Sequence, residues 1–201
     1  MAHVAGLFDN HDEALDAVRA LEEAGIASDD ISLISNNTNG QYVGDALKDD
    51  DTTVTGAGTG AGLGAVAGGG AGLLTGLGLL AIPGVGPVVA GGWLTATLVG
   101  LVGGAAAGGV AGGLVGALVE SGIPDEEAQA YTEAIRRGST LVVVRCSEEE
   151  RQKVEAIFNE WARVDIRRRR DAYLEEGWEG FNASGVPYTA DEIERERSRW
   201  G

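Results

Sequence analysis

The sequence has few cysteines and few basic residues. Cys146 is its only cysteine, so an internal disulfide cannot form, which is typical of a protein in a reducing cytoplasm. Its 15 Lys and Arg residues are outnumbered by 31 Asp and Glu residues, and the formal net charge is −16. Because nucleic-acid phosphates require clustered basic side chains, we expect no nucleic-acid partner. We also expect no secretory signal, because no basic segment precedes an apolar core and Asp9 follows early.

Charged residues are missing altogether between Asp51 and Glu120. This charge-free part, residues 52–119, holds 23 of the 33 glycines, many of them four residues apart. The expected helix-packing positions are Gly56, Gly60, Gly64, Gly68, Gly72, Gly76, Gly100, Gly104, Gly108, Gly112 and Gly116. In water, glycine destabilises a helix by roughly 1 kcal/mol relative to alanine. Such arms therefore need lipid or a tight protein interface, and glycines four residues apart favour close helix crossings.

A turn divides the charge-free part into two arms. The expected turn residues are Pro83, Gly84, Gly86 and Pro87. We therefore predict a glycine-zipper antiparallel helical hairpin over residues 52–119. At ~1.5 Å rise per residue each arm is longer than the ~30 Å hydrocarbon layer, so the hairpin could span a membrane or enter and leave it on the cytoplasmic side. The alternative is burial between copies in a soluble homo-oligomer. Self-association is expected in either environment.

The segments that flank the charge-free part alternate between strand and helix patterns. Strands are predicted at residues 3–8, 31–35, 140–146 and 164–170, and helices at residues 10–24, 125–137 and 147–161. The run Leu141-Val142-Val143-Val144 predicts a strand buried on both faces. Without the charge-free part and the helix after it, the order is β-α-β-β-α-β. This is the order of a ferredoxin-like sandwich, an α+β fold with two helices on one face of an antiparallel sheet.

The predicted organisation has four parts. They are the first half of the ferredoxin-like domain with a linker (1–51), the glycine-zipper hairpin (52–119), the second half of the domain (120–170) and an acidic aromatic tail (171–201). In the tail, Thr189 and Glu192 form a capping box that predicts a final helix. Trp178 and Phe181 have no core of their own, so we expect them to anchor the tail to the domain or to a neighbouring subunit.

Several motifs together resemble one protein family. They are Val4-Ala5-Gly6-Leu7-Phe8-Asp9, the glycine-rich arms around Ala81-Ile82-Pro83-Gly84-Val85-Gly86-Pro87, the helix start Gly122-Ile123-Pro124, the strand up to Val144 and the aromatic tail. This pattern is similar to the bacterial general stress protein family, whose members are also described as heat-induced or low-temperature-induced stress proteins. The resemblance covers nearly the whole chain. It implies a stress-linked bacterial protein and supplies no catalytic residues.

Other candidate sites are better explained by structure than by chemistry. The arginine run 167–170 lies between Asp165 and Asp171, so an edge strand with ion pairs is favoured over a site for lipid or nucleic acid. The acidic runs 49–51 and 148–150 lack the spacing of a calcium loop. His3, His11 and Cys146 show no catalytic or metal-ligating pattern, and no phosphate-binding loop is present. We expect no catalytic residue, metal or cofactor.

These observations predict a non-enzymatic bacterial stress-response protein. Its glycine-zipper hairpin would mediate self-association and insert in, or lie on, a membrane at the cytoplasmic face. The expected partners are other copies of the chain and membrane lipid. The alternative is a soluble homo-oligomeric small-molecule-binding or sensing module with the hairpin buried in the oligomer, since ferredoxin-like sandwiches often serve that role.

Overall fold

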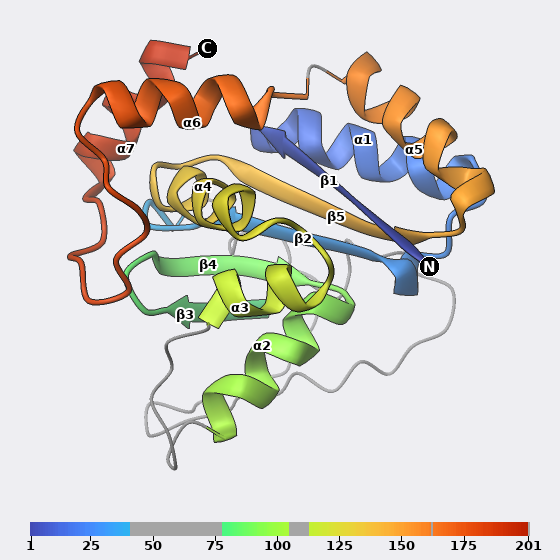
Figure 1. Cartoon of the computed structure of the whole chain (residues 1–201), viewed down its shortest axis with the longest axis horizontal. Coiled ribbons are helices and arrows are strands. Elements are labelled where there is room, and N and C mark those ends of the chain that lie inside the picture. The colour runs from blue at the N-terminus through green and yellow to red at the C-terminus, as the bar shows by residue number, and fades with distance from the viewer. Residues whose placement is uncertain (41–77, 105–112, 162, 201) are drawn as a thin grey trace.

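The computed structural model describes residues 1–40, 78–104, 113–161 and 163–200, and it shows an α+β molecule (Figure 1). Its five-stranded antiparallel sheet has the order β1-β5-β2-β4-β3. The strands are β1 (Ala2–Phe8), β2 (Ile31–Asn36), β3 (Gly78–Ile82), β4 (Gly86–Gly91) and β5 (Thr140–Cys146). The helices are α1 (His11–Glu23), α2 (Trp93–Gly104), α3 (Gly113–Glu120), α4 (Asp125–Arg136), α5 (Glu148–Glu160), α6 (Ile166–Glu175) and α7 (Ala190–Trp200), with a short 3₁₀ turn at Ser28–Asp30.

Strand β5 is an interior strand of the sheet, and its prediction as a strand buried on both faces is confirmed. It pairs antiparallel with β1 on one side and β2 on the other, so β1 and β2 run parallel to each other with β5 between them. Val142 and Val144 join the core beneath α1 and α5, whereas Leu141 and Val143 join the core on the opposite face. All four side chains are fully buried.

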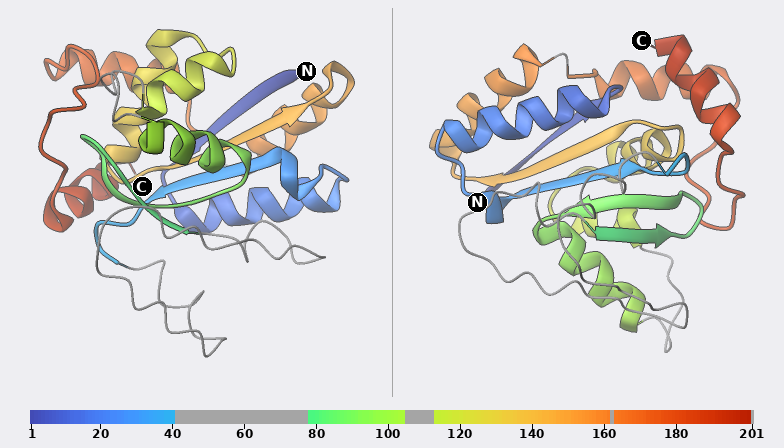
Figure 2. Two further views of the ribbon diagram at one scale, coloured as in Figure 1. Left: turned by 90° about the horizontal axis from the view of Figure 1, so that it is seen from below. Right: turned by 180° about the vertical axis from the view of Figure 1, so that it is seen from behind.

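Two helical layers cover the sheet (Figure 2). Helices α1 and α5 pack on one face, where Phe8 and Phe158 meet edge to face with ring centroids 5.7 Å apart. Helices α2, α3, α4 and α6 supply the larger core on the other face. Strands β3 and β4 belong to this larger core through Ile82, Val88 and Ala90. The described elements of the charge-free part are therefore packed into the domain.

The prediction of a helical hairpin is wrong at the turn. Residues 78–91 form two paired strands, β3 and β4, and β4 adds to the edge of β2 through pairs such as Leu33↔Gly91 and Asn36↔Val88. Two physical reasons account for the difference. The four-residue glycine spacing is interrupted here, and branched side chains such as Val88 and Val89 favour a strand next to an available sheet edge. The second arm does contain helices, α2 and α3.

The predicted strand at residues 164–170 is also wrong. Only Val164 bridges to Leu7 in β1, and α6 begins two residues later. Asp165 caps this helix, because its side chain accepts hydrogen bonds from the backbone N–H groups of Arg167 (3.0 Å) and Arg168 (3.3 Å). Arginine is also a good helix former, which favours a helix over a strand for the run 167–170.

Other helix starts agree with the sequence. Asn10 Oδ1 accepts a hydrogen bond from the Asp12 amide at 2.9 Å and caps α1. Ser147 and Glu150 form the reciprocal capping box of α5. Among the described helices, none is long and apolar enough to cross a membrane.

Candidate functional site

The C-terminal strap, residues 176–200, contacts the rest of the described domain at several points and is the candidate site. It leaves α6, passes α4 and the β3–β4 turn, and returns as α7 near the start of β5 (Figure 1). Trp178, Phe181 and Trp200 are partly buried against the larger core, and Ile193 is fully buried. Trp178 also meets the ring of Tyr173 edge to face at 5.9 Å. The two predicted tail anchors, Trp178 and Phe181, thus contact the domain of their own chain.

The strap lies directly on the β3–β4 turn. Gly84 and Gly86 both have positive φ angles, +76° and +105°. A Cβ atom at Gly84 would lie 2.6 Å from the Asn182 carbonyl oxygen, and one at Gly86 would lie 3.0 Å from Pro187 Cβ. Val85 between them is fully buried although it is at the tip of a turn. The glycines therefore serve the turn and also admit the strap.

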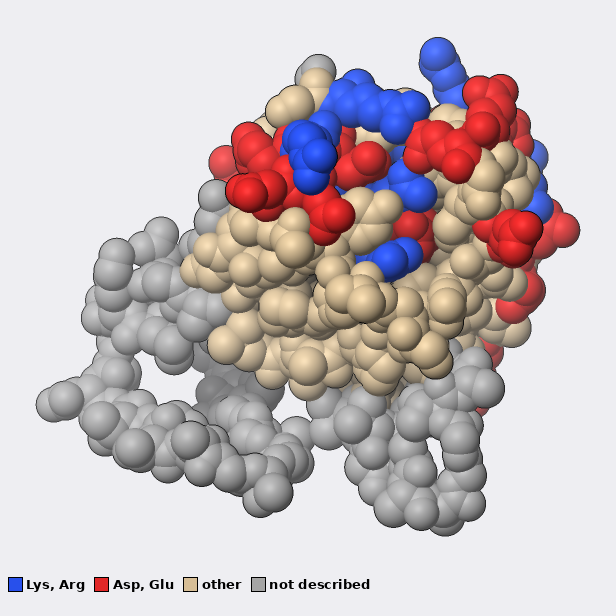
Figure 3. Space-filling model, turned by 90° about the vertical axis from the view of Figure 1, so that its left-hand side faces the viewer, with Lys and Arg blue, Asp and Glu red and all other residues tan. Residues whose placement is uncertain are grey.

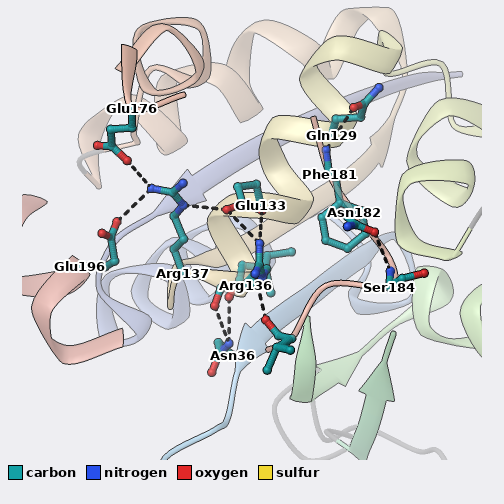
Figure 4. A network of polar contacts seen from close by, with 12 residues as sticks. Asn36, Gln129, Glu133, Arg136, Arg137, Glu176, Phe181, Asn182, Ser184 and Glu196 are labelled. Carbon is teal, nitrogen blue, oxygen red and sulfur yellow. Dashed lines mark hydrogen bonds and ion pairs between the residues drawn. The ribbon is translucent and has the colours of Figure 1, made fainter. Parts of the chain in front are cut away.

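Two side chains of α4 hold the strap by its backbone (Figure 4). Gln129 Oε1 accepts a hydrogen bond from the Phe181 N–H at 3.3 Å, and Arg136 Nη2 donates to the Val186 carbonyl at 2.9 Å. The Arg136 guanidinium also lies 4.8 Å from the ring centre of Tyr188. The strap thus passes along α4 as an irregular segment with a turn at residues 182–185.

An arginine clamp fixes both ends of the strap (Figure 4). Arg137 is bonded to Glu133 at 2.8 Å, to Glu176 at 2.7 Å and to Glu196 at 3.4 Å. Its guanidinium lies 4.1 Å from the ring centre of Tyr173. Burial by itself would lower the pKa of Arg137, but hydrogen bonds to the two glutamates Glu133 and Glu176 raise its pKa overall. Arg137 is therefore a permanent cation that joins α4 to both ends of the strap.

A second buried arginine connects α6 to the end of β1. Arg169 makes a bidentate contact with Asp9, with distances of 2.8 and 2.6 Å, and lies 4.0 Å from the ring centre of Trp200. Its neighbours Arg167 and Arg170 pair with acids at the start of α4, namely Glu127 at 3.3 Å and Glu126 at 2.9 Å. The ion pairs predicted for the arginine run are therefore present, although they are formed from a helix.

A small hollow lies where α7 meets the body of the domain. It is lined by Asp9, Arg137, Ser139, Arg169, Tyr173, Glu196, Arg197 and Trp200. The charged lining residues are three arginines (137, 169 and 197) and two acids (9 and 196), and ion pairs join Arg169 to Asp9 and Arg137 to Glu196. Arg197 donates to the Gly138 carbonyl from two nitrogens, at 3.3 and 3.1 Å. These contacts stabilise the docked strap.

A buried polar chain runs from α1 into the sheet. His11 Nδ1 lies 3.0 Å from Ser35 Oγ, which in turn lies 2.8 Å from Thr140 Oγ1. Burial lowers the pKa of His11 to about 4, the nearby Asp12 opposes this shift, and Arg197 adds to it. The imidazole is therefore neutral at pH 7. Ser35 and Thr140 are almost completely buried, so this serine–histidine pair does not meet substrate from solvent.

The remaining predicted site residues are dispersed. The ring of His3 lies tilted against that of Trp93, with ring centroids 5.4 Å apart, and Cys146 is a buried free thiol whose pKa is raised by burial. The acidic run 148–150 forms the first turn of α5, while the run 49–51 lies outside the described residues. Across the described ranges, no cluster of His, Cys, Asp and Glu has a metal-binding arrangement.

Most of the predicted glycine-zipper positions lie outside the described residues. These are Gly56, Gly60, Gly64, Gly68, Gly72, Gly76, Gly108 and Gly112. Gly100 and Gly104 lie in α2. Gly116 lies in α3, and a Cβ atom there would have no neighbour within 4 Å among the described residues.

Sequence reasoning missed the partners of the strap. The signal for α6 was available, because Ile166, Arg169 and Tyr173 are buried and have the spacing of one helix face. No local signal connects Arg169 with Asp9, or Arg137 with Glu176.

No family model, curated protein or solved structure matches the chain.

Proposed function

We propose that this protein is non-enzymatic and self-associates through its charge-free part, residues 52–119. One observation carries the proposal, the separation of charge from apolar surface. All 46 charged residues (15 basic plus 31 acidic) lie outside the charge-free part. Its described elements, β3, β4, α2 and α3, gather on one side of the molecule, opposite α6 and α7, and the uncharged surface in Figure 3 lies below the charged groups.

Electrostatics supports this choice of contact surface. Copies with a net charge of −16 repel one another, so two charged faces would resist approach. The side with β3 and β4 avoids this repulsion and also exposes apolar groups. Leu79 in β3 is 55% exposed, and β3 is the last strand in the order of the sheet. An uncharged edge strand favours pairing with another chain.

We extend the proposal to packing between the glycine-rich arms and to lipid contact at the cytoplasmic face. The support is in the sequence, where glycines at four-residue intervals allow helices to approach closely. Self-association and lipid contact use the same charge-free part. They differ in whether detergent is needed to release the protein from membranes.

We also infer that the domain is a variant of the ferredoxin-like sandwich. The support is the β1-α1-β2 unit with β5 between its strands and the packing of α1 and α5 on one face. The fourth strand is reduced to the Val164–Leu7 bridge, and β4 and β3 extend the opposite edge. The resemblance of the sequence to bacterial general stress proteins supports a role in the stress response, which a growth comparison of deletion and parent strains under heat and cold would test.

A small-molecule-binding role is less well supported. The hollow beneath α7 is lined by charged groups that already contact one another or backbone carbonyls. A ligand there would have to displace several of these contacts.

The test introduces one charge on each side of the molecule. Leu79→Glu places a carboxylate on β3, and Leu174→Glu places one on α6, where the parent side chain is 44% exposed. We expect sedimentation velocity to show assemblies for the parent and for Leu174→Glu, and a shift to monomer for Leu79→Glu. Equal behaviour of the two variants would contradict the proposal.

The same samples separate lipid contact from soluble assembly. After lysate fractionation, carbonate washing leaves a lipid-embedded protein in the pellet, whereas a soluble oligomer is recovered without detergent. Complete recovery of a detergent-free assembly would remove lipid contact and retain self-association.

A further inference from the structure

The strap lies against the β3–β4 turn, next to apolar residues of the larger core. Ile82 and Val85 are buried there, and the strap backbone at Asn182 and Ala183 lies against Gly84 beside them. A turn of this kind usually projects into solvent, with polar residues at its tip. Here the tip residue Val85 belongs to the larger core, and the strap lies beside it.

The strap is held by partly exposed ion pairs at its ends and by the aromatic side chains of Trp178, Phe181 and Trp200, which are only partly buried against the larger core. The side chain of Glu176 is 27% exposed, that of Glu196 17% and that of Arg199 49%. Ile193 is the only buried residue of α7. Ion pairs at partly exposed sites contribute little stability individually and are screened by salt. Segments with few buried apolar contacts open more readily than the core around them.

Glu176 has a central place in this attachment. It accepts a hydrogen bond from Arg137, the C-cap residue of α4, and also pairs with Arg199 at the end of α7. Arg137 keeps Glu133 as a partner when Glu176 is lost, so the buried cation does not become isolated. Changing Glu176 therefore weakens the strap selectively.

We propose that the strap is a releasable cover, and that its release allows the surface around Ile82 and Val85 to bind the same surface of a second copy. The inference rests on the proposed self-association and identifies a contact and its control. A second copy is the partner because the surface belongs to the charge-free part and is continuous with β3 and β4. Two such surfaces meet without bringing the acidic regions of the copies together.

The experiment compares two charge reversals in the full chain. Glu176→Arg replaces the acid that pairs with Arg137 and Arg199. Glu179→Arg makes the same change of charge at an exposed strap residue for which the structure shows no ion pair among the described residues. Hydrogen exchange of the backbone amides in residues 178–189 reports release of the strap, and sedimentation velocity reports dimerisation.

We expect Glu176→Arg to accelerate exchange in residues 178–189 at least tenfold and to lower the dimer dissociation constant at least tenfold. Glu179→Arg should resemble the parent in both measurements. If Glu176→Arg lowers the yield of folded protein, Glu176→Gln should move both values in the same direction by a smaller factor.

Three outcomes would overturn the inference. Unchanged exchange in Glu176→Arg would show that this clamp does not hold the strap. Faster exchange with an unchanged dissociation constant would show that the covered surface is not a contact, while self-association of the parent would remain. Faster exchange accompanied by flotation with phosphatidylglycerol vesicles instead of dimerisation would assign the surface to lipid. If no variant and no parent sample assembles at any concentration, the proposed function fails as well.

Discussion

At the residue scale, two glycines with similar positive φ angles have different roles. Gly25 and Gly84 both have positive φ, at +91° and +76°. A Cβ atom at Gly25 would have no neighbour within 4 Å, whereas one at Gly84 would lie 2.8 Å from Ala183 Cα. The first glycine ends a helix. The second also makes room for a backbone that is distant in the sequence.

This difference predicts unequal effects of alanine. Gly25→Ala should reduce the free energy of unfolding by about 1 kcal/mol, because an L-residue is strained in the left-handed region. Gly84→Ala should reduce it by about 2–4 kcal/mol, because overpacking against the strap adds to the same strain. Denaturant unfolding followed by circular dichroism measures both. Similar losses would show that the strap does not press on the turn in solution.

At the element scale, β3, β4, α2 and α3 share one core with the rest of the sheet. Leu94 of α2 is fully buried in that core, and its backbone N–H donates to Ser32 Oγ of β2 at 3.0 Å. Gly92 immediately before α2 has a φ of +91°, and a Cβ there would lie 2.1 Å from the Ile31 carbonyl oxygen. These contacts tie the start of α2 directly to β2.

We therefore expect Leu94→Ala to destabilise the whole domain. The loss should be about 2–5 kcal/mol, as for other leucines truncated in a packed core. Leu79→Ala, at a half-exposed position of β3, should change stability by less than about 1 kcal/mol. Thermal unfolding in a calorimeter shows one lowered transition if α2 belongs to the domain. An unchanged main transition in Leu94→Ala would show that α2 unfolds independently.

At the scale of the whole molecule, charged groups and charge-free elements lie on different sides. The ion pairs of α4, α6 and the strap lie on one side, and the charge-free elements lie on the other (Figure 3). The net charge of −16 opposes association at low ionic strength. Salt screens this repulsion over roughly 10 Å at 0.1 M, and it leaves apolar contacts in place.

Self-association should consequently strengthen with salt. Raising sodium chloride from about 0.02 M to about 0.3 M, which shortens the screening length severalfold, should lower the dissociation constant at neutral pH. Analytical ultracentrifugation at matched protein concentrations is the measurement. Dissociation of the assemblies by salt would instead indicate that ion pairs between copies hold them together.

Local signals in the sequence determined a large part of the fold. A continuous run of apolar, mostly branched residues specified β5, and the cap residues Asn10, Ser147 and Thr189 specified where helices begin. These features could be predicted because their hydrogen bonds join residues two or three positions apart. The α+β class and the antiparallel sheet also followed from the order of the elements. The finer ferredoxin-like assignment and the contact between copies stay predictions.

Tertiary contacts decided what the local signals left open. Residues 166–175 form a helix in which Arg169 reaches Asp9, 160 positions earlier. Residues 78–91 form strands because β2 offers a free edge to β4. The strap is bound by Arg137, and it fits closely against Gly84, where a side chain would clash with it. The sequence near these residues does not indicate either contact. Each of these features depends on contacts between segments that are distant in the sequence. Such contacts form only when the chain has folded.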